Sequence, residues 1–364
     1  STLTTEVGSS GGTYIPRLLG SAFSYNLTGG TIELAGTGAS HVFQTLRGGR
    51  TYKNIKFSGA NSTYSYPTLT DYKNLSSNTV IDSTLIITND AIVDCIDNSG
   101  GTVYFRGPGG LTMSGSGSRM RMKSLNETLP LLAGFTTPYN LTGGTVEWYG
   151  TSSSQTHSLR GTDSNSVNIN YFNVDVNSTG ANVGASGANV VAGAGFGVAG
   201  TMNVNSPACF QLGSGFTITD AGTSTFEVKP GATFKYGGSI ATSGATGNVR
   251  TDTRTFPTTA SYGFVGSITP QDPGTGLPSK MVNMYLDKAS AGNLVTITKD
   301  EEITDTLVFY TGIVKTNSST INVSNLATNA IKAGNTSGND KYVQGRLQRK
   351  VDGSSTYSFP IGHS

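Results

Sequence analysis

An internal repeat constrains the fold of this chain more than any other feature of its sequence. The segment YNLTGGTIELAGT at 25–37 returns as YNLTGGTVEWYGT at 139–151, with ten of thirteen positions identical and a spacing of 114 residues. Shorter matches flank both copies, and a looser third copy falls near 264–286. Self-similarity at a fixed spacing is the signature of repetitive architectures, so three related blocks are expected. These blocks are 1–117, 118–245 and 246–364.

Short apolar runs alternate with polar residues inside each block. Runs such as TLIIT (84–88), GTVYF (101–105) and LVTIT (294–298) are bounded by Gly, Asn, Asp or Ser. They recur about every eight to twelve residues, which predicts β-strands joined by tight turns. No stretch has a helical period of about 3.6 residues. In the repeated segment, the Gly pair should provide the backbone freedom for a turn, and T-(I/V)-E should alternate inward and outward side chains.

Composition favours one of two all-β architectures. The chain has 49 Gly and 13% charged residues, and the stretch at 177–200 contains few large apolar side chains for the core of a sandwich. A solenoid can stack small residues inside and form Asn or Thr ladders between coils. A right-handed parallel β-helix (β-solenoid) with higher-order repeats of about 114 residues is therefore expected. Tandem β-sandwich domains are the alternative, since such domains have roughly 100 residues.

Charge and hydropathy argue against several classes of partner. The formal net charge is +2, from 24 basic and 22 acidic residues, which is too weak a field to predict nucleic-acid binding. No apolar run approaches the roughly 18 residues of a transmembrane helix, so no membrane insertion is expected. The first residues do not have the basic region and following apolar region of a signal peptide, so Ser1 is expected to begin a mature chain or an excised fragment. Cys95 and Cys209 lie one repeat apart and are expected to be buried thiols that do not pair.

Two acidic clusters are the candidates for catalysis or metal binding. Asp90, Asp94 and Asp97 crowd into TNDAIVDCIDN, and the second cluster is TKDEEITDT at 298–306. Either cluster could bind Ca²⁺ or place two carboxylates across a glycosidic bond. The region that corresponds to the first cluster in the next block, 203–212, has no carboxylate. Turn capping and solvated faces are therefore the favoured interpretation, and no catalytic residue, metal ligand or cofactor is predicted.

Aromatic residues are the better indication of a binding surface. Rings in polar surroundings stack on sugars or anchor protein partners, although tyrosines along a strand also occur as cross-strand packing. The candidates for a glycan or partner surface are Tyr64, Tyr66, Tyr72, Trp148 and Tyr149.

The last third of the chain carries a family resemblance. The series TGIVKTNSSTINV (311–323), KYVQGRLQRKV (341–351) and TYSFPIG (356–362) resembles a segment of very large cell-surface proteins of Bacteroidetes. The resemblance implies export by the type IX secretion route and display as an adhesin, with a gliding-motility adhesin as one form. It also implies that the chain is a fragment that continues into further domains. Two short triplets, beginning at Asp82 and Asp305, are similar to the O-glycosylation signal of that phylum and give Ser83 and Thr306 as candidate acceptors.

The leading hypothesis is a non-enzymatic, extracellular structural or adhesive segment of a large bacterial surface protein. Its expected partners are a glycan or a cell or substratum surface, the secretion machinery, and neighbouring domains of the same chain. One alternative is a β-helical polysaccharide lyase or hydrolase that uses the acidic cluster at 90–97. The other is a glycan-binding fibre or tail-spike module.

Overall fold

The computed structural model describes twelve stretches of the chain, and all structural statements below concern these residues. They are residues 2–5, 29–35, 51–59, 63–66, 79–95, 105–106, 109–122, 139–150, 157–162, 166–179, 190–333 and 341–362. Within them the chain forms β-strands and no helix. It follows that no described helix could cross a membrane.

The chain divides into two compact units, which are described separately. Unit 1 comprises Ser1–Thr151, His157–Asp175 and Phe196–Gly200, and unit 2 comprises Ser152–Thr156, Val176–Gly195 and Thr201–Ser364. The division into three sequence blocks stays a prediction.

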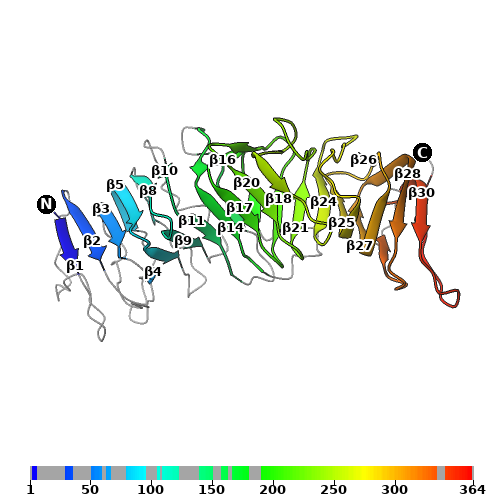
Figure 1. Ribbon diagram of the computed structural model, residues 1–364, viewed down its shortest axis with the longest axis horizontal. Coiled ribbons are helices and arrows are strands. Elements are labelled where there is room, and N and C mark those ends of the chain that lie inside the picture. Colours follow the sequence, from blue (N-terminus) through cyan, green and yellow to red (C-terminus); the bar gives the residue numbers. More distant parts are fainter. Residues whose placement is uncertain are drawn as a thin grey trace. The chain divides into compact units, whose positions relative to one another are not determined.

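Unit 1 contains three groups of strands, and neighbouring strands within each group pair in parallel. The first group is β1 (Thr2–Thr5), β2 (Thr31–Ala35), β3 (Thr51–Ser58), β5 (Thr79–Thr88), β8 (Gly110–Met113) and β10 (Asn140–Leu141), with β7 (Phe105–Arg106) beside β5. The second is β4 (Thr63–Tyr66), β6 (Ile92–Cys95), β9 (Arg119–Met122), β11 (Thr145–Trp148) and β14 (Asn173–Val176). The third pairs β13 (Asn170–Tyr171) with β16 (Phe196–Val198), and β12 (His157–Leu159) also belongs to this unit. In Figure 1 the arrows of β1, β2, β3, β5 and β8 lie side by side in chain order.

Unit 2 repeats this arrangement with longer strands toward its end. Its largest group is β15 (Val190–Ala192), β18 (Cys209–Leu212), β21 (Thr233–Tyr236), β24 (Ser261–Gly266), β25 (Lys280–Lys288), β27 (Glu301–Thr311) and β28 (Ile313–Val323). Three strands flank its last members, namely β26 (Leu294–Thr296), β29 (Ile331–Ala333) and β30 (Val343–Arg349). A second group is β17 (Thr201–Val204), β20 (Thr225–Val228) and β23 (Thr253–Thr255), and a third is β19 (Ile218–Asp220) with β22 (Val249–Arg250).

The register of these pairs identifies the fold as a parallel β-solenoid. Thr201 of β17 pairs with Thr225 of β20, which pairs with Thr253 of β23. The chain therefore returns to the same sheet after 24 and then 28 residues, which is one coil each time. Because a sandwich is built from antiparallel strands, the tandem-sandwich alternative is wrong, and the predicted β-helix is confirmed.

Alternating side chains fill the inside of each coil. In β17 and β20 every second residue is buried, as expected where one face of a strand meets the core. Large rings stack along the core between successive coils: Phe210 and Phe234 are paired in register, with ring centroids 6.0 Å apart and planes within 5°. Phe226, from the facing sheet, packs on Phe234 with ring centroids 5.1 Å apart.

Polar side chains bridge successive coils, as the sequence led us to expect. Asn205 donates from Nδ2 to Oδ1 of Asn177 at 2.7 Å. Asn283 donates to the hydroxyl of Ser261 at 3.0 Å. Because each bridge joins equivalent positions of neighbouring coils, it satisfies polar groups that the coil-to-coil contact would otherwise strip of water.

The two copies of the repeated segment share a turn but not a sheet. The second Gly of each pair has positive φ, +82° at Gly30 and +77° at Gly144, which confirms the predicted role of the Gly pair. At Gly144 a Cβ would also lie 2.4 Å from the carbonyl oxygen of Ser118. The following strands, β2 and β11, belong to different sheets. The repeated sequence segment therefore specifies a local turn and strand, and not one fixed position in the coil.

Candidate functional site

The outer face of β9 and β11 in unit 1 carries a connected set of charged side chains. Arg119 and Arg121 both reach Glu147, with nitrogen-to-oxygen distances of 2.9 Å, and Arg119 also contacts Asp175 at 3.1 Å. We call Arg119, Arg121, Glu147 and Asp175 the charged ladder. Its four charges cancel, and it links three consecutive coils on the side of the sheet opposite to the core.

The strand pattern explains how the sequence places the charged ladder. In RMRM at 119–122 the two methionines are buried and the two arginines are half-exposed, so the alternation sends both guanidinium groups outward. Arg121 is directly opposite Glu147 in the parallel register. The arginines were not among the residues predicted from the sequence, although the RMRM alternation is a signal that could have found them.

Glu33, which occupies the position of Glu147 in the first copy of the repeat, has a similar neighbour. Lys56 lies opposite Glu33 in register and contacts it at 2.9 Å. Hydrogen bonds from the Ser58 hydroxyl and from Lys56 hold the pKa of Glu33 below its ordinary value. Both copies of the repeat thus place a glutamate opposite a cation of the neighbouring strand.

Trp148 corrects the predicted aromatic surface. Its side chain is fully buried, and its ring packs edge-on against Tyr171 with centroids 6.0 Å apart. Strand alternation is the reason, because Trp148 lies two residues after buried Val146 and therefore shares the inward face. Its Nε1 has no hydrogen-bond partner among the described residues. Trp148 is a core residue and contributes nothing to an exposed surface.

Tyr149 does lie at the surface, beside the charged ladder. Its ring is half-buried, and the guanidinium carbon of Arg121 lies 4.0 Å from the ring centroid. A cation at that distance is attracted to the ring face and fixes its orientation. Tyr149 and Arg121 therefore form a pre-oriented aromatic and cationic pair on the outer face.

The structure does not describe the side chains of the remaining predicted tyrosines. Tyr64 and Tyr66 belong to β4, whose backbone pairs in parallel with β6, but their side chains lie outside the described part. Tyr72 also lies outside the described residues. Whether these three rings form a surface stays a prediction.

Of the acidic cluster at 90–97, the structure describes the side chain of Asp90 alone. Asp90 occupies a turn with φ of +61°, where its Oδ1 accepts a hydrogen bond from the backbone nitrogen of Gly117 at 2.8 Å. This contact between coils supports the turn-capping interpretation for Asp90. Asp94 is part of β6, but its side chain is outside the described part, as is all of Asp97.

The second acidic cluster separates into four different environments. Asp300 accepts a hydrogen bond from a backbone nitrogen of the next coil at 2.8 Å, Glu302 pairs with Lys280 at 3.2 Å, and Asp305 accepts from Asn325 at 2.9 Å. Glu301 alone points inward and is 2% exposed. Burial raises its pKa to about 8, from an ordinary value of 4.5. Strand alternation therefore singles out one carboxyl group from a run that looks uniform in sequence.

The candidate modification sites differ in accessibility. Thr306 is 8% exposed and lies in the middle of β27, where its backbone nitrogen donates to Asn283. Thr306 is therefore poorly accessible in the folded chain, and its modification stays a prediction. Ser83 is half-buried in β5, and its modification stays a prediction.

Two further expectations concern metal and cysteine chemistry. Across the described stretches, no group of three or more His, Cys, Asp or Glu side chains is arranged to hold a metal ion. Cys209 is fully buried in β18, as expected. The side chain of Cys95 lies outside the described part.

Comparison with known proteins adds no further constraint. No protein-family model, no curated protein sequence and no solved structure matches this chain.

Proposed function

We propose that this chain is a non-enzymatic structural and adhesive segment of a large extracellular surface protein. The observation that carries the proposal is that successive coils are joined at three levels. Parallel backbone ladders connect the strands, aromatic rings stack inside the coils, and the charged ladder ties neighbouring coils on the outside. Such a body resists local opening, because every coil is held by both of its neighbours.

The charged ladder also provides an adhesive face. A half-buried tyrosine held by an arginine presents a fixed ring for stacking on a sugar, at little cost in conformational entropy. The half-exposed guanidinium groups of Arg119 and Arg121 offer hydrogen-bond donors to hydroxyl groups. A glycan or a glycan-coated cell or substratum is therefore the proposed partner of Tyr149 and Arg121.

The location and export route rest on the sequence resemblance alone. The motifs at 311–323, 341–351 and 356–362 are similar to those of Bacteroidetes surface proteins. They support the proposal that the chain is carried to the cell surface by type IX secretion, as part of a longer protein.

Retention on immobilised polysaccharides tests the adhesive part of the proposal. The purified chain and its Tyr149→Ala and Arg121→Met variants are passed over surfaces coated with algal, plant and bacterial polysaccharides. The wild type is expected to be retained on at least one coating, with at least fivefold weaker retention of both variants.

Tyr357→Ala is the matched control. Tyr357 is a half-buried tyrosine, and the guanidinium carbon of Arg349 lies 4.5 Å from its ring centroid. Unit 2 therefore contains a second pair of a tyrosine ring and an arginine. Retention that falls equally in Tyr357→Ala, or that is absent from every coating, would contradict the assignment of the face.

A further inference from the structure

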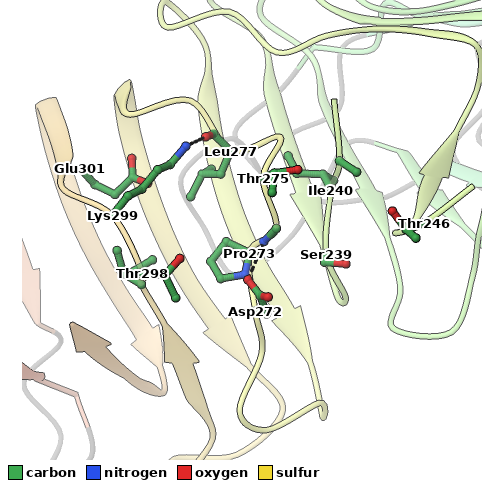
Figure 2. Close-up of a pocket in the computed structure, with 13 residues that line it drawn as sticks. Ser239, Ile240, Thr246, Asp272, Pro273, Thr275, Leu277, Thr298, Lys299 and Glu301 are labelled. Carbon is green, nitrogen blue, oxygen red and sulfur yellow. Dashed lines mark hydrogen bonds between the residues drawn. The ribbon is translucent and has the colours of Figure 1, made fainter. Parts of the chain in front are cut away.

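Unit 2 contains a cavity at the beginning of β27. Its volume is about 410 Å³, and it is enclosed mainly by three segments, 239–241, 272–277 and 297–301. Figure 2 shows Glu301 and Lys299 on one side of it and Ile240 on the other. Sites for small ligands typically have volumes of roughly 300–1,000 Å³, so the cavity is large enough for a sugar ring.

Backbone hydrogen bonds hold the walls of the cavity in place. The Ile240 nitrogen donates to Pro273 at 2.9 Å, and the Gly276 nitrogen donates back to the Ile240 carbonyl at 2.8 Å. Gly274 has φ of +85°, and a Cβ there would overlap the backbone of Ile240. Because these contacts lie within the backbone of the chain itself, they hold the walls in one arrangement, which lowers the entropic cost of binding.

Glu301 is the group in this cavity that needs an explanation. It lines the wall (Figure 2) and is 2% exposed, yet neither carboxyl oxygen has a hydrogen-bond partner among the described residues. Leaving a buried polar group without a hydrogen-bond partner is unfavourable. A protein that keeps such a group beside a cavity has a donor and acceptor available for a bound molecule.

The neighbouring groups define what kind of molecule fits. The Lys299 ammonium donates to the carbonyl of Leu277, and Asp272 accepts from the Gly274 nitrogen at 2.8 Å. With Glu301 protonated, the charges of Lys299 and Asp272 cancel, so the cavity favours neither a cation nor an anion. Burial supports this state, because it raises the pKa of Glu301 to about 8.

The remaining lining combines polar and apolar side chains, as binding of a sugar ring requires. Ser239, Thr246, Thr275 and Thr298 contribute hydroxyl-bearing side chains, and apolar walls come from Ile240, Leu277 and Ile297. Sugars present hydroxyl groups around their rim and C–H groups on their faces, and hydroxyl groups both donate and accept hydrogen bonds.

We propose that this cavity binds one uncharged saccharide unit, with ring hydroxyls hydrogen-bonded to the Glu301 carboxyl group. The ligand supplies the hydrogen-bond partners that the carboxyl group lacks. This inference rests on the proposed adhesive function and deepens it, because it names a ligand class and a second binding place in unit 2.

Titration of the whole chain with soluble sugars tests the inference. Glucose, galactose, xylose, N-acetylglucosamine and their disaccharides are added at millimolar concentration, and binding is followed by calorimetry and by NMR shifts. At least one sugar is expected to bind saturably. Glu301→Gln keeps a donor and an acceptor and should bind within about threefold of wild type, whereas Glu301→Leu should bind at least tenfold more weakly.

Two further variants make the result decisive. Glu302→Gln changes the adjacent, outward-facing carboxyl group and should bind like wild type. Thr298→Phe fills the cavity from an exposed rim position and should abolish binding even if Glu301→Leu fails to fold. The inference is overturned if no sugar binds saturably, or if Thr298→Phe binds as tightly as wild type.

The titration, taken together with the polysaccharide experiments, separates this inference from the proposed function. Release of oligosaccharides from a polymer would refute the non-enzymatic proposal and leave the cavity assignment standing. Retention on polysaccharide surfaces that depends on Tyr149, without sugar binding at Glu301, would refute the cavity assignment alone.

Discussion

The buried carboxyl group of Glu301 makes the stability of the chain depend on pH in a specific direction. In the unfolded chain the group ionises near its ordinary pKa of 4.5, whereas burial raises the folded pKa to about 8. Between these values the folded state holds a proton that the unfolded state has lost. A group with a raised folded pKa stabilises the fold below its unfolded pKa, and that contribution is lost as the pH rises toward the folded pKa.

The size of the effect follows from the proton count. A difference of one bound proton gives a slope of about 1.4 kcal/mol per pH unit. From pH 5.5 to pH 7.5 the wild type should therefore lose about 2–3 kcal/mol of unfolding free energy relative to Glu301→Gln. Burial lowers the pKa of Lys288 to about 8, so its titration also begins near pH 7.5, but it is common to wild type and Glu301→Gln and does not enter their difference.

Urea unfolding followed by circular dichroism measures this difference at each pH. Other titrating groups cancel, because wild type and Glu301→Gln share them. Glu302→Gln is the control: hydrogen bonds from Lys280 and Ser324 lower the pKa of Glu302, so its removal should not produce a loss that grows with pH. Curves for wild type and Glu301→Gln that stay parallel from pH 5.5 to 7.5 would refute the reasoning.

Three further predictions test the turn, the charged ladder and the core. Gly144→Ala should destabilise the chain by about 2–4 kcal/mol, because φ is positive and the Cβ position is blocked. Gly29→Ala is the control and should be nearly neutral, because there is open space around Gly29. Equal melting temperatures of the two variants would contradict this. Glu147→Gln should lower the free energy of unfolding by about 1–3 kcal/mol, because it removes a charge that two arginines share. A decrease below about 0.3 kcal/mol in urea unfolding would show that the charged ladder is not stabilising. Phe234→Ala should cost about 3–5 kcal/mol by the same assay, because its ring is fully buried and stacked on Phe210, and a cost below about 1 kcal/mol would contradict the packing.

The fold could be predicted because its causes are local. Strand alternation, turn residues and the repeated TGG can each be recognised within a short stretch of sequence. The positive φ of Gly30 and Gly144 confirms the turn predicted from the Gly pair. The position of a repeated segment in the coil could not be predicted in this way. It depends on how many residues each intervening turn takes up, and these turns differ between the copies.

The candidate site was predicted less well, for two physical reasons. Trp148 was assigned to the surface by residue type, although its spacing from Val146 placed it inside. Glu301 shares its strand face with Ile303, which is fully buried, so alternation could have marked it as inward. The cavity beside it could not have been found, because its walls come from segments up to 60 residues apart, from 239–241 to 297–301.

The most direct test of the whole account is one incubation of the purified chain with the polysaccharide panel, with and without Ca²⁺. Mass spectrometry of the soluble fraction then measures released oligosaccharides, while the bound fraction measures retention of the chain. A structural and adhesive segment predicts retention on at least one polysaccharide with no change in polymer length. Release of oligosaccharides that increases with time would contradict the account and would identify the chain as an enzyme.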